Sequence, residues 1–236
     1  LVVSHGRQGR DLSRALEHDP DLLARDGRAF AFPPATELDL DAEAAQYVTR
    51  QSFAARAALT VLTPGAWPEP VLDACAGRGN KTRHLLELGK SVIASDIHQG
   101  RLKALRRDMP EVPCFRARAD LPTPMRRAPG SVLLDLPCSG LGVLSRRPDI
   151  KWKRGPRDVR DLTRLQAAIL DASYESLRPG GLMAVITCTL NPDENELLVE
   201  GFRKRTDKAR VARTWTTPHD SPLGEFFFSA LIEKGK

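Results

Sequence analysis

An acid and two thiols follow apolar runs in this sequence, at Asp135, Cys138 and Cys188. The run Val132–Leu134 leads into Asp-Leu-Pro-Cys-Ser-Gly, and a second run ends at Thr187 directly before Cys188. A thiolate is a strong nucleophile, so either cysteine suits covalent catalysis beside a carboxylate. The alternative is a buried strand that ends in a Pro-Gly turn with an inert cysteine, and the first segment alone favours neither.

Alternating strands and helices are predicted from Pro70 onward, and they place these residues at the strand ends of one sheet. We expect strands at 71–75, 91–96, 112–116, 131–135, 182–187, 211–215 and 226–232. Helices are expected at 81–88, 100–109, 158–177 and 193–205, whereas 121–130 is too rich in proline for a full crossover helix. This alternation predicts a doubly wound, mostly parallel α/β sheet, whose ligands bind beyond the carboxyl ends of the strands.

Residues 1–66 are predicted to form a small helical extension. Helical periodicity covers 11–25, and Asp41 is a candidate cap for a second helix that runs to about Leu62. A Thr-Pro-Gly turn then ends that helix, and a proline-rich segment leads into the main domain. We therefore expect two parts, an extension at 1–66 and a domain at 67–236.

Composition narrows the class of protein. The 236 residues are 41% hydrophobic and 28% charged, as in globular chains, and the net charge of +6 weakly favours a polyanionic partner such as nucleic acid. No apolar run approaches the roughly 20 residues that span a bilayer, so no membrane contact is expected. The four cysteines form no Cys-x-x-Cys pair and the five histidines lack ligand spacing, which predicts free thiols, no metal and a cytoplasmic location.

A glycine-containing turn joins the first predicted strand to its helix and is a candidate cofactor loop. Gly77 and Gly79 let backbone approach a ligand, although the loop matches neither Walker A nor a full G-x-G-x-x-G pattern. Asp96 ends the second strand, where an acid suits ribose hydroxyls, and Asp120 follows the third, where it accepts from an adenine amino group or faces solvent. Position alone leaves a dinucleotide, S-adenosylmethionine and a ligand-free tight turn all open.

Four segments together resemble the Fmu/Sun family of S-adenosylmethionine-dependent RNA cytosine-5 methyltransferases. They are residues 73–82, 96–101, 135–142 with 148–152, and 187–188 with 192–196. The resemblance covers about residues 45–232, and its most specific parts are the Asp-x-Pro-Cys-Ser-Gly and Thr-Cys segments in this order. The chain departs from the family in the cofactor loop, which usually reads Ala-Pro-Gly-Gly-Lys and here reads Gly-Arg-Gly-Asn-Lys at 77–81.

The resemblance implies a Rossmann-like methyltransferase sheet with an antiparallel last strand as the catalytic domain. It also implies methyl transfer to carbon 5 of cytosine in RNA, with ribosomal RNA first and transfer RNA second. Cys188 would be the nucleophile, Cys138 would assist product release and Asp135 would steady the base. Chemistry alone leaves the cysteine roles open, because the Pro-Cys cysteine itself attacks in DNA cytosine-5 methyltransferases. The cofactor-binding residues implied are Cys75, Ala76, Gly77, Gly79, Lys81, Asp96, Arg101, Asp120 and Asp135.

Basic residues after the Pro-Cys loop are candidate contacts for RNA phosphates. We expect the substrate at Pro137, Arg146, Arg147 and Lys151, with a solvated basic face as the alternative. Trp152 either stacks on a base or packs against the protein.

The Asp-Leu-Pro-Cys segment argues against an amino-group methyltransferase. The main competing function is a non-catalytic RNA-binding or ribosome-assembly factor, against which the two thiols argue. We expect RNA as the partner, S-adenosylmethionine as the cofactor and a monomeric chain.

Overall fold

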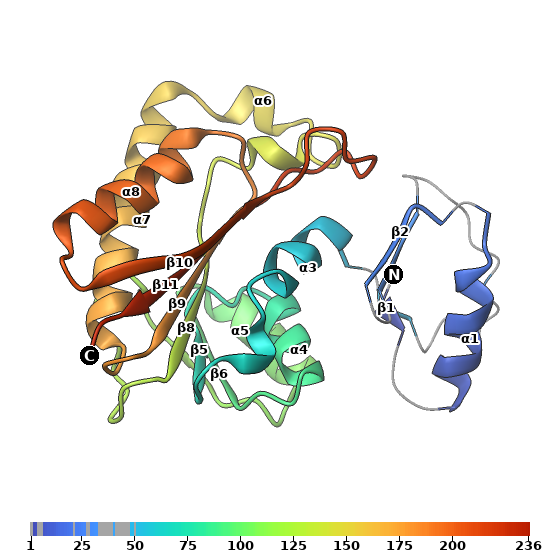
Figure 1. The fold of residues 1–236 in the computed structure, drawn as a ribbon, viewed down its shortest axis with the longest axis horizontal. Coiled ribbons are helices and arrows are strands. Elements are labelled where there is room, and N and C mark those ends of the chain that lie inside the picture. The colour runs from blue at the N-terminus through green and yellow to red at the C-terminus, as the bar shows by residue number, and fades with distance from the viewer. Residues whose placement is uncertain are drawn as a thin grey trace.

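The structure is a computed structural model that describes residues 2–3, 7–20, 22–26, 29–32, 40, 48–49 and 51–236. Its larger part is a seven-stranded sheet in the order β10-β11-β9-β8-β5-β6-β7 (Figure 1). Neighbours from β7 to β9 pair in parallel, and β11 pairs antiparallel with both β9 and β10. The doubly wound, mostly parallel sheet with an antiparallel last strand is therefore confirmed. The strands are β5 (Val71–Asp73), β6 (Val92–Asp96), β7 (Cys114–Arg116), β8 (Ser131–Asp135), β9 (Leu182–Thr187), β10 (Ala209–Thr216) and β11 (Phe228–Lys234).

Helices cover both faces of this sheet. On one face lie α7 and α8, and on the other lie α3 and α4, as Figure 1 shows. The short α6 and three 3-10 turns connect these elements. The bounds are α3 (Phe53–Thr60), α4 (Asn80–Glu87), α5 (Gln99–Asp108), α6 (Ile150–Lys153), α7 (Pro156–Ser176) and α8 (Glu196–Arg205), with η1 (Pro64–Ala66), η2 (Leu141–Val143) and η3 (Pro192–Glu194).

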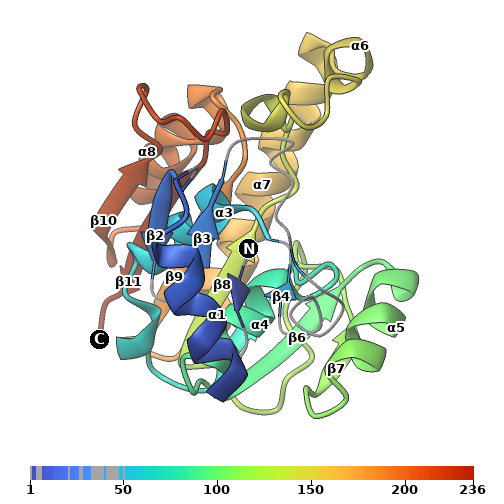
Figure 2. The same cartoon turned by 90° about the vertical axis from the view of Figure 1, so that its right-hand side faces the viewer.

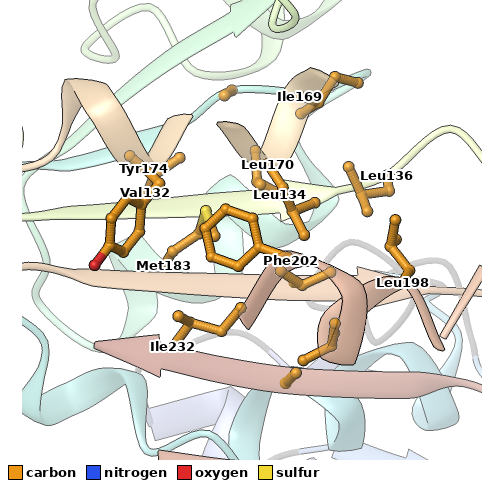
Figure 3. Close-up of a cluster of buried hydrophobic side chains, with 14 of the residues drawn as sticks. Val132, Leu134, Leu136, Ile169, Leu170, Tyr174, Met183, Leu198, Phe202 and Ile232 are labelled. Atoms are coloured by element: carbon orange, nitrogen blue, oxygen red, sulfur yellow. The ribbon is translucent and has the colours of Figure 1, made fainter. Parts of the chain in front are cut away.

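The middle of strand β8, Val132–Leu134, is apolar because both faces of the strand are covered. Val132 and Leu134 pack under α7 and α8, where Ile169 and Phe202 meet them (Figure 3). Leu133 points to the opposite face and packs in the cluster beneath α3 and α4. Alternate side chains of a strand face opposite sides of the sheet, so burial of both sides requires an unbroken apolar run.

The chain reverses its direction of travel across the sheet between β5 and β8. From β5 it moves outward to β6 and β7, then returns to β8 on the other side of β5 and continues to β9. The segment that joins β7 to β8 contains no helix, as its prolines predicted. Open α/β sheets bind ligands at such a reversal, outside the carboxyl ends of the strands.

The N-terminal part contains strands as well as a helix, which corrects the prediction of an all-helical extension. Helix α1 spans Arg7–Glu17, and the short strands pair in the order β2-β3-β1-β4 (Figure 2). The helix predicted at 11–25 is present as far as Glu17 and ends there, because Pro20 disfavours helical backbone at the residue before it, and Ala24 already belongs to β2. The strands are β1 (Val2–Val3), β2 (Ala24–Asp26), β3 (Ala29–Ala31) and β4 (Val48–Thr49).

The expected second helix is shorter than predicted. Of the segment from Asp41 to Leu62, only α3 is helical among the described residues, and Asp41 itself lies outside them. Ser52 caps α3, since its hydroxyl accepts a hydrogen bond from the Ala55 backbone N–H at 3.0 Å. Helix α3 packs against the large sheet and also bonds to the N-terminal strands, through Thr60 and Asp26. The division at residue 66 stays a prediction.

None of the helices within the described ranges has the length and apolar character needed to cross a bilayer.

Candidate active site

A cavity of about 510 Å³ lies beyond the carboxyl ends of β5, β8 and β9. The turn after β5, the loop after β8, the segment around α6 and Cys188 surround it. Its volume lies within the range that small ligands occupy. The predicted site residues that line it are Cys75, Ala76, Gly77, Lys81, Arg101, Asp135, Pro137, Cys138, Arg147 and Cys188.

The two cysteines approach each other inside this cavity. Their Sγ atoms are 3.2 Å apart, and the Cys188 backbone N–H donates to the Cys138 sulfur at 3.3 Å. Parallel pairing of β8 with β9 explains the approach, because it places Asp135 beside Ile186 and thus brings both following loops to one point. All four cysteines of the chain are free thiols.

The environment separates the acidities of these two thiols. The hydrogen bond with Cys138 lowers the pKa of Cys188, and the positive charge of Lys81 acts in the same direction against burial and the Asp135 carboxylate. The same hydrogen bond, together with burial, raises the pKa of Cys138 well above its ordinary value. These directions make Cys188 the more acidic thiol of the pair and Cys138 the less acidic one.

Asp135 and Lys81 form an ion pair at the cavity wall. The Lys81 Nζ lies 2.7 Å from the Asp135 Oδ2, and the lysine side chain is only 9% exposed whereas that of Asp135 is 41% exposed. A buried ammonium needs such a partner, since unpaired charge is costly away from water. The carboxylate is therefore held in place by its protein partner and still faces the open cavity.

The glycine turn is shaped by its two left-handed residues and by Asp96. Gly77 and Gly79 have φ angles of +58° and +87°, which side-chain-bearing residues avoid. A Cβ at Gly77 would meet no heavy atom within 4 Å, whereas one at Gly79 would lie 2.3 Å from the Met109 Cε. The Gly77 N–H donates to the Asp96 Oδ2 at 2.9 Å. Gly79 thus packs closely against Met109 and does not line the cavity, whereas Gly77 borders the cavity.

A buried carboxyl fastens the helix after this turn to β5. The Thr82 hydroxyl donates to the Asp73 Oδ2 at 2.7 Å, and burial raises the pKa of Asp73 to about 7. This contact fixes the first turn of α4, which carries Lys81.

Five predicted residues do not line the cavity. Asp96 accepts the hydrogen bond from the Gly77 N–H, and Gly79 packs against Met109. Asp120 is held by both Nε and Nη2 of Arg118, which lowers the pKa of its carboxyl. Arg146 pairs with Glu225, and Lys151 is exposed on α6. Sequence position after a strand or in a basic run therefore did not by itself place a side chain in the cavity.

A buried carboxylate, Glu194, connects the two cysteine loops. It is fully buried and accepts hydrogen bonds from the Ser139 N–H at 2.8 Å and from the Ser139 hydroxyl at 2.5 Å. The oxygen that accepts from the Ser139 N–H also accepts from Gln166 at 3.0 Å, and the other oxygen also accepts from the Thr189 hydroxyl at 3.3 Å. Gln166 also donates to the Pro137 carbonyl at 2.9 Å. One carboxylate thus fixes the residue after Cys138 relative to the residue after Cys188.

Sequence reasoning missed this connection and several lining residues. The sequence predicts one helix over 193–205, but the structure divides it at Asn195 into η3 and α8, and the Asn195 side-chain amide donates to the Thr189 carbonyl at 2.9 Å. A polar Gln166 on the same side as Ile169 and Leu170 of α7 was the available signal, because inward polar residues need partners. The missed lining residues include Arg78, Asn80, Ser139, Gly140, Val143, Asp149 and Ile150.

The donor chemistry of this site suits an organic cofactor. Among the described residues no group of three or more histidines, cysteines and carboxylates could hold a metal ion. The open space beside Gly77 and the cavity volume instead accommodate an organic molecule close to the main chain.

A family profile and curated relatives both match this chain to ribosomal RNA methyltransferases. A family profile described as "16S rRNA methyltransferase RsmB/F" matches residues 59–231. The ribosomal RNA small subunit methyltransferase B of Vibrio cholerae is 40% identical over 203 residues, which are 80% of this chain and 46% of that protein. The chain thus spans about half the length of the curated relatives it matches.

Solved structures give the same fold. The crystal structure of NSun6 from Pyrococcus horikoshii with SFG aligns at a TM-score of 0.71 and 26% identity, over 85% of this chain and 57% of that one. A methyltransferase homolog protein from Pyrococcus horikoshii aligns at 0.72 and 20% identity, over 95% of this chain and 82% of that one, which supports the fold alone.

Proposed function

The chain belongs to the 16S rRNA methyltransferase RsmB/F family, and we propose that it methylates carbon 5 of a cytosine in ribosomal RNA. The family match confirms the resemblance to Fmu/Sun-type RNA methyltransferases that the motifs indicated. Ribosomal RNA is the proposed substrate because the curated relatives carry that name, with transfer RNA as the second candidate. The observation that supports the reaction best is the contact between a more acidic Cys188 and a less acidic Cys138 in one cavity.

The cofactor is S-adenosylmethionine, which supplies an electrophilic methyl group when bound. Residues of the glycine turn fit it, since the backbone at Gly77 is open to the cavity and Arg101 lines the same wall. Asp96 would act by holding the Gly77 N–H in place, and Lys81 by fixing Asp135. Asp120 is a weaker candidate for contact with the cofactor, because both of its carboxylate oxygens already accept hydrogen bonds from Arg118.

Cys188 is the proposed nucleophile. Its lowered pKa favours the thiolate, which adds to carbon 6 of the cytosine and makes carbon 5 nucleophilic. Asp135 would orient the base edge while the ion pair with Lys81 holds its carboxylate in place. Cys138, 3.2 Å away and of raised pKa, would give its own proton to the departing Cys188 sulfur as the carbon–sulfur bond breaks, and the thiolate so formed would take up the carbon 5 proton. The reverse assignment of the two cysteines is less favourable, since Cys138 is the harder thiol to ionise.

RNA would reach the cavity along its basic rim. Arg147 lines the cavity together with Lys153 and Arg154, and Lys151 lies beside them on α6. Such cations suit phosphate groups at the sides of the entering strand. Arg146 is a weaker candidate than the sequence indicated, because Glu225 neutralises it. We also propose that the chain acts as a monomer in the cytoplasm, in keeping with its four free thiols.

Transfer of a tritiated methyl group tests the function. Purified chain, labelled S-adenosylmethionine and total RNA from cells that lack the gene should give label in RNA, and nuclease digestion should yield 5-methylcytidine. A chain that binds the cofactor and RNA but transfers no label would support the competing function, a non-catalytic RNA-binding or ribosome-assembly factor. Bisulfite mapping of the labelled RNA would then identify the cytosine.

A further inference from the structure

We propose that Trp152 is a stacking platform for an unpaired nucleobase next to the target cytosine. This inference rests on the proposed function, because it concerns how RNA enters the same cavity. The Trp152 side chain is 91% exposed, the highest value among the large apolar residues exposed in the described part of the chain. Indole is large and apolar, so full exposure of it beside a cavity indicates a contact that is made only with a ligand.

The position of Trp152 follows from the anchoring of α6. Ile150 is 7% exposed and packs against the Cys138 loop, where its Cδ1 would lie 2.9 Å from a Cβ at Gly140. Residues two apart on a helix point to opposite sides, so burial of Ile150 directs Trp152 to solvent. Figures 1 and 2 show α6 at the outer end of the molecule, beyond the first turn of α7. The indole is thus exposed on an element whose other side contacts the active site.

The residues on either side of the indole set the chemistry of its partner. Ile150, Lys153 and Arg154 line the cavity, so Trp152 lies at its rim. Lys153 pairs with Asp149 at 2.8 Å, whereas Lys151 and Arg154 pair with no carboxylate among the described residues. An exposed aromatic side chain between two unpaired cations matches single-stranded nucleic acid, which offers base faces and phosphates in alternation.

A stacking platform at the rim would assist the reaction by stabilising RNA whose target base is extruded. A target cytosine must leave its stack to reach Cys188 at the wall of the cavity, and unstacking costs free energy. The base beside it then loses a stacking partner. An indole at the rim can replace that partner. It stacks on the flat face that every base has, so it does not distinguish one base from another. Trp152 would therefore support the extruded conformation without selecting the sequence.

Binding of a labelled nine-residue RNA, UUUUCUUUU, tests this role by fluorescence anisotropy. Stacking on an aromatic residue is lost in Trp152→Ala, so its Kd should rise about fivefold or more, whereas Trp152→Phe should stay within about threefold of wild type. Leu88→Ala is the matched control, because Leu88 is 43% exposed at the far end of α4 and should leave the Kd unchanged. Acrylamide quenching gives a second readout, since Trp152 is the most exposed of the three tryptophans, with Trp67 only 2% exposed and Trp215 half-buried. The RNA should protect the wild-type fluorescence and have less effect in Trp152→Phe.

The outcomes separate this inference from the function on which it rests. Equal affinities for wild type, Trp152→Ala and Leu88→Ala, in a chain that does methylate RNA, would overturn the platform alone. A wild-type chain that binds no RNA at low salt would overturn both. A Trp152→Ala variant that binds RNA normally but loses self-association in sedimentation would assign the indole to a protein contact instead, against the proposal.

Discussion

The Sγ atoms of Cys138 and Cys188 lie 3.2 Å apart, although fifty residues separate them in the chain. Adjacent parallel strands β8 and β9 produce this contact, because each cysteine follows the carboxyl end of its strand. One hydrogen bond between them lowers the pKa of Cys188 and raises that of Cys138. The pair is therefore asymmetric before any substrate binds.

This asymmetry predicts opposite behaviour of two alanine variants. Cys188→Ala should form no covalent adduct with RNA and transfer no methyl group, because the attacking thiolate is absent. Cys138→Ala should still add to the base but release it more than about 100-fold more slowly, since removal of the carbon 5 proton loses its base. Denaturing electrophoresis of enzyme, cofactor and RNA measures the adduct. Cys114→Ala, on β7, is the control and should resemble wild type. An adduct that accumulates in Cys188→Ala instead would reverse the roles.

The reactivity of the thiols should depend on pH in the same asymmetric way. A lowered pKa means that Cys188 loses its proton at a lower pH than an ordinary thiol, so iodoacetamide should label it first as the pH rises from 6 to 9. Cys138 should be labelled only at higher pH, because its pKa is raised. Peptide mass spectrometry measures both rates. In Cys138→Ala the hydrogen bond is gone, so labelling of Cys188 at pH 7.5 should slow by roughly fivefold or more. Faster labelling there would contradict this account of the pair.

Alanine substitutions at the two glycines of the cofactor turn should differ in their effects on stability and on cofactor binding. Gly79→Ala combines a φ of +87° with a Cβ 2.3 Å from Met109, so it should lower the free energy of unfolding by about 2–4 kcal/mol. Gly77→Ala meets open space and should cost only about 1 kcal/mol of stability. Its methyl group would border the cavity, however, and should weaken binding of S-adenosylhomocysteine. Urea unfolding and calorimetry measure the two effects, with Gly65→Ala as a neutral control. Equal losses of stability at 77 and 79 would argue against this division of roles.

The pattern of apolar residues was sufficient for the large sheet, because each central strand is buried on both faces and reads as an apolar run. At the N-terminus, periodicity predicted the helix correctly only as far as Glu17, because Pro20 and the short strand pairs outweigh the helical spacing of the residues that follow. The site was predicted in part, since residues that follow strand ends meet at one edge of the sheet. Contacts between segments far apart, such as Glu194 with Ser139 or Arg146 with Glu225, depend on tertiary packing and leave no local pattern.

Salt should reveal which basic residues meet RNA. Lys151→Ala and Arg154→Ala should each reduce the slope of log Kd against log salt by about 0.7, the value for one phosphate contact on a single strand. Lys153→Ala should change the slope less, since Asp149 already neutralises that lysine at 2.8 Å. Lys204→Ala, in the last turn of α8, serves as the control. Slopes that are equal in all four variants would return this basic run to an ordinary solvated surface.

The bonding of Glu194 also limits how the site can open. Because this one carboxyl group holds Ser139 on one loop and Thr189 on the other, a fluctuation that frees either loop must break hydrogen bonds to a fully buried polar group. That cost ties the exposure of the two cysteines to a single rare event rather than to two independent ones. Amide hydrogens on both loops should therefore exchange with solvent deuterium at a common rate, as one cooperative unit of the fold.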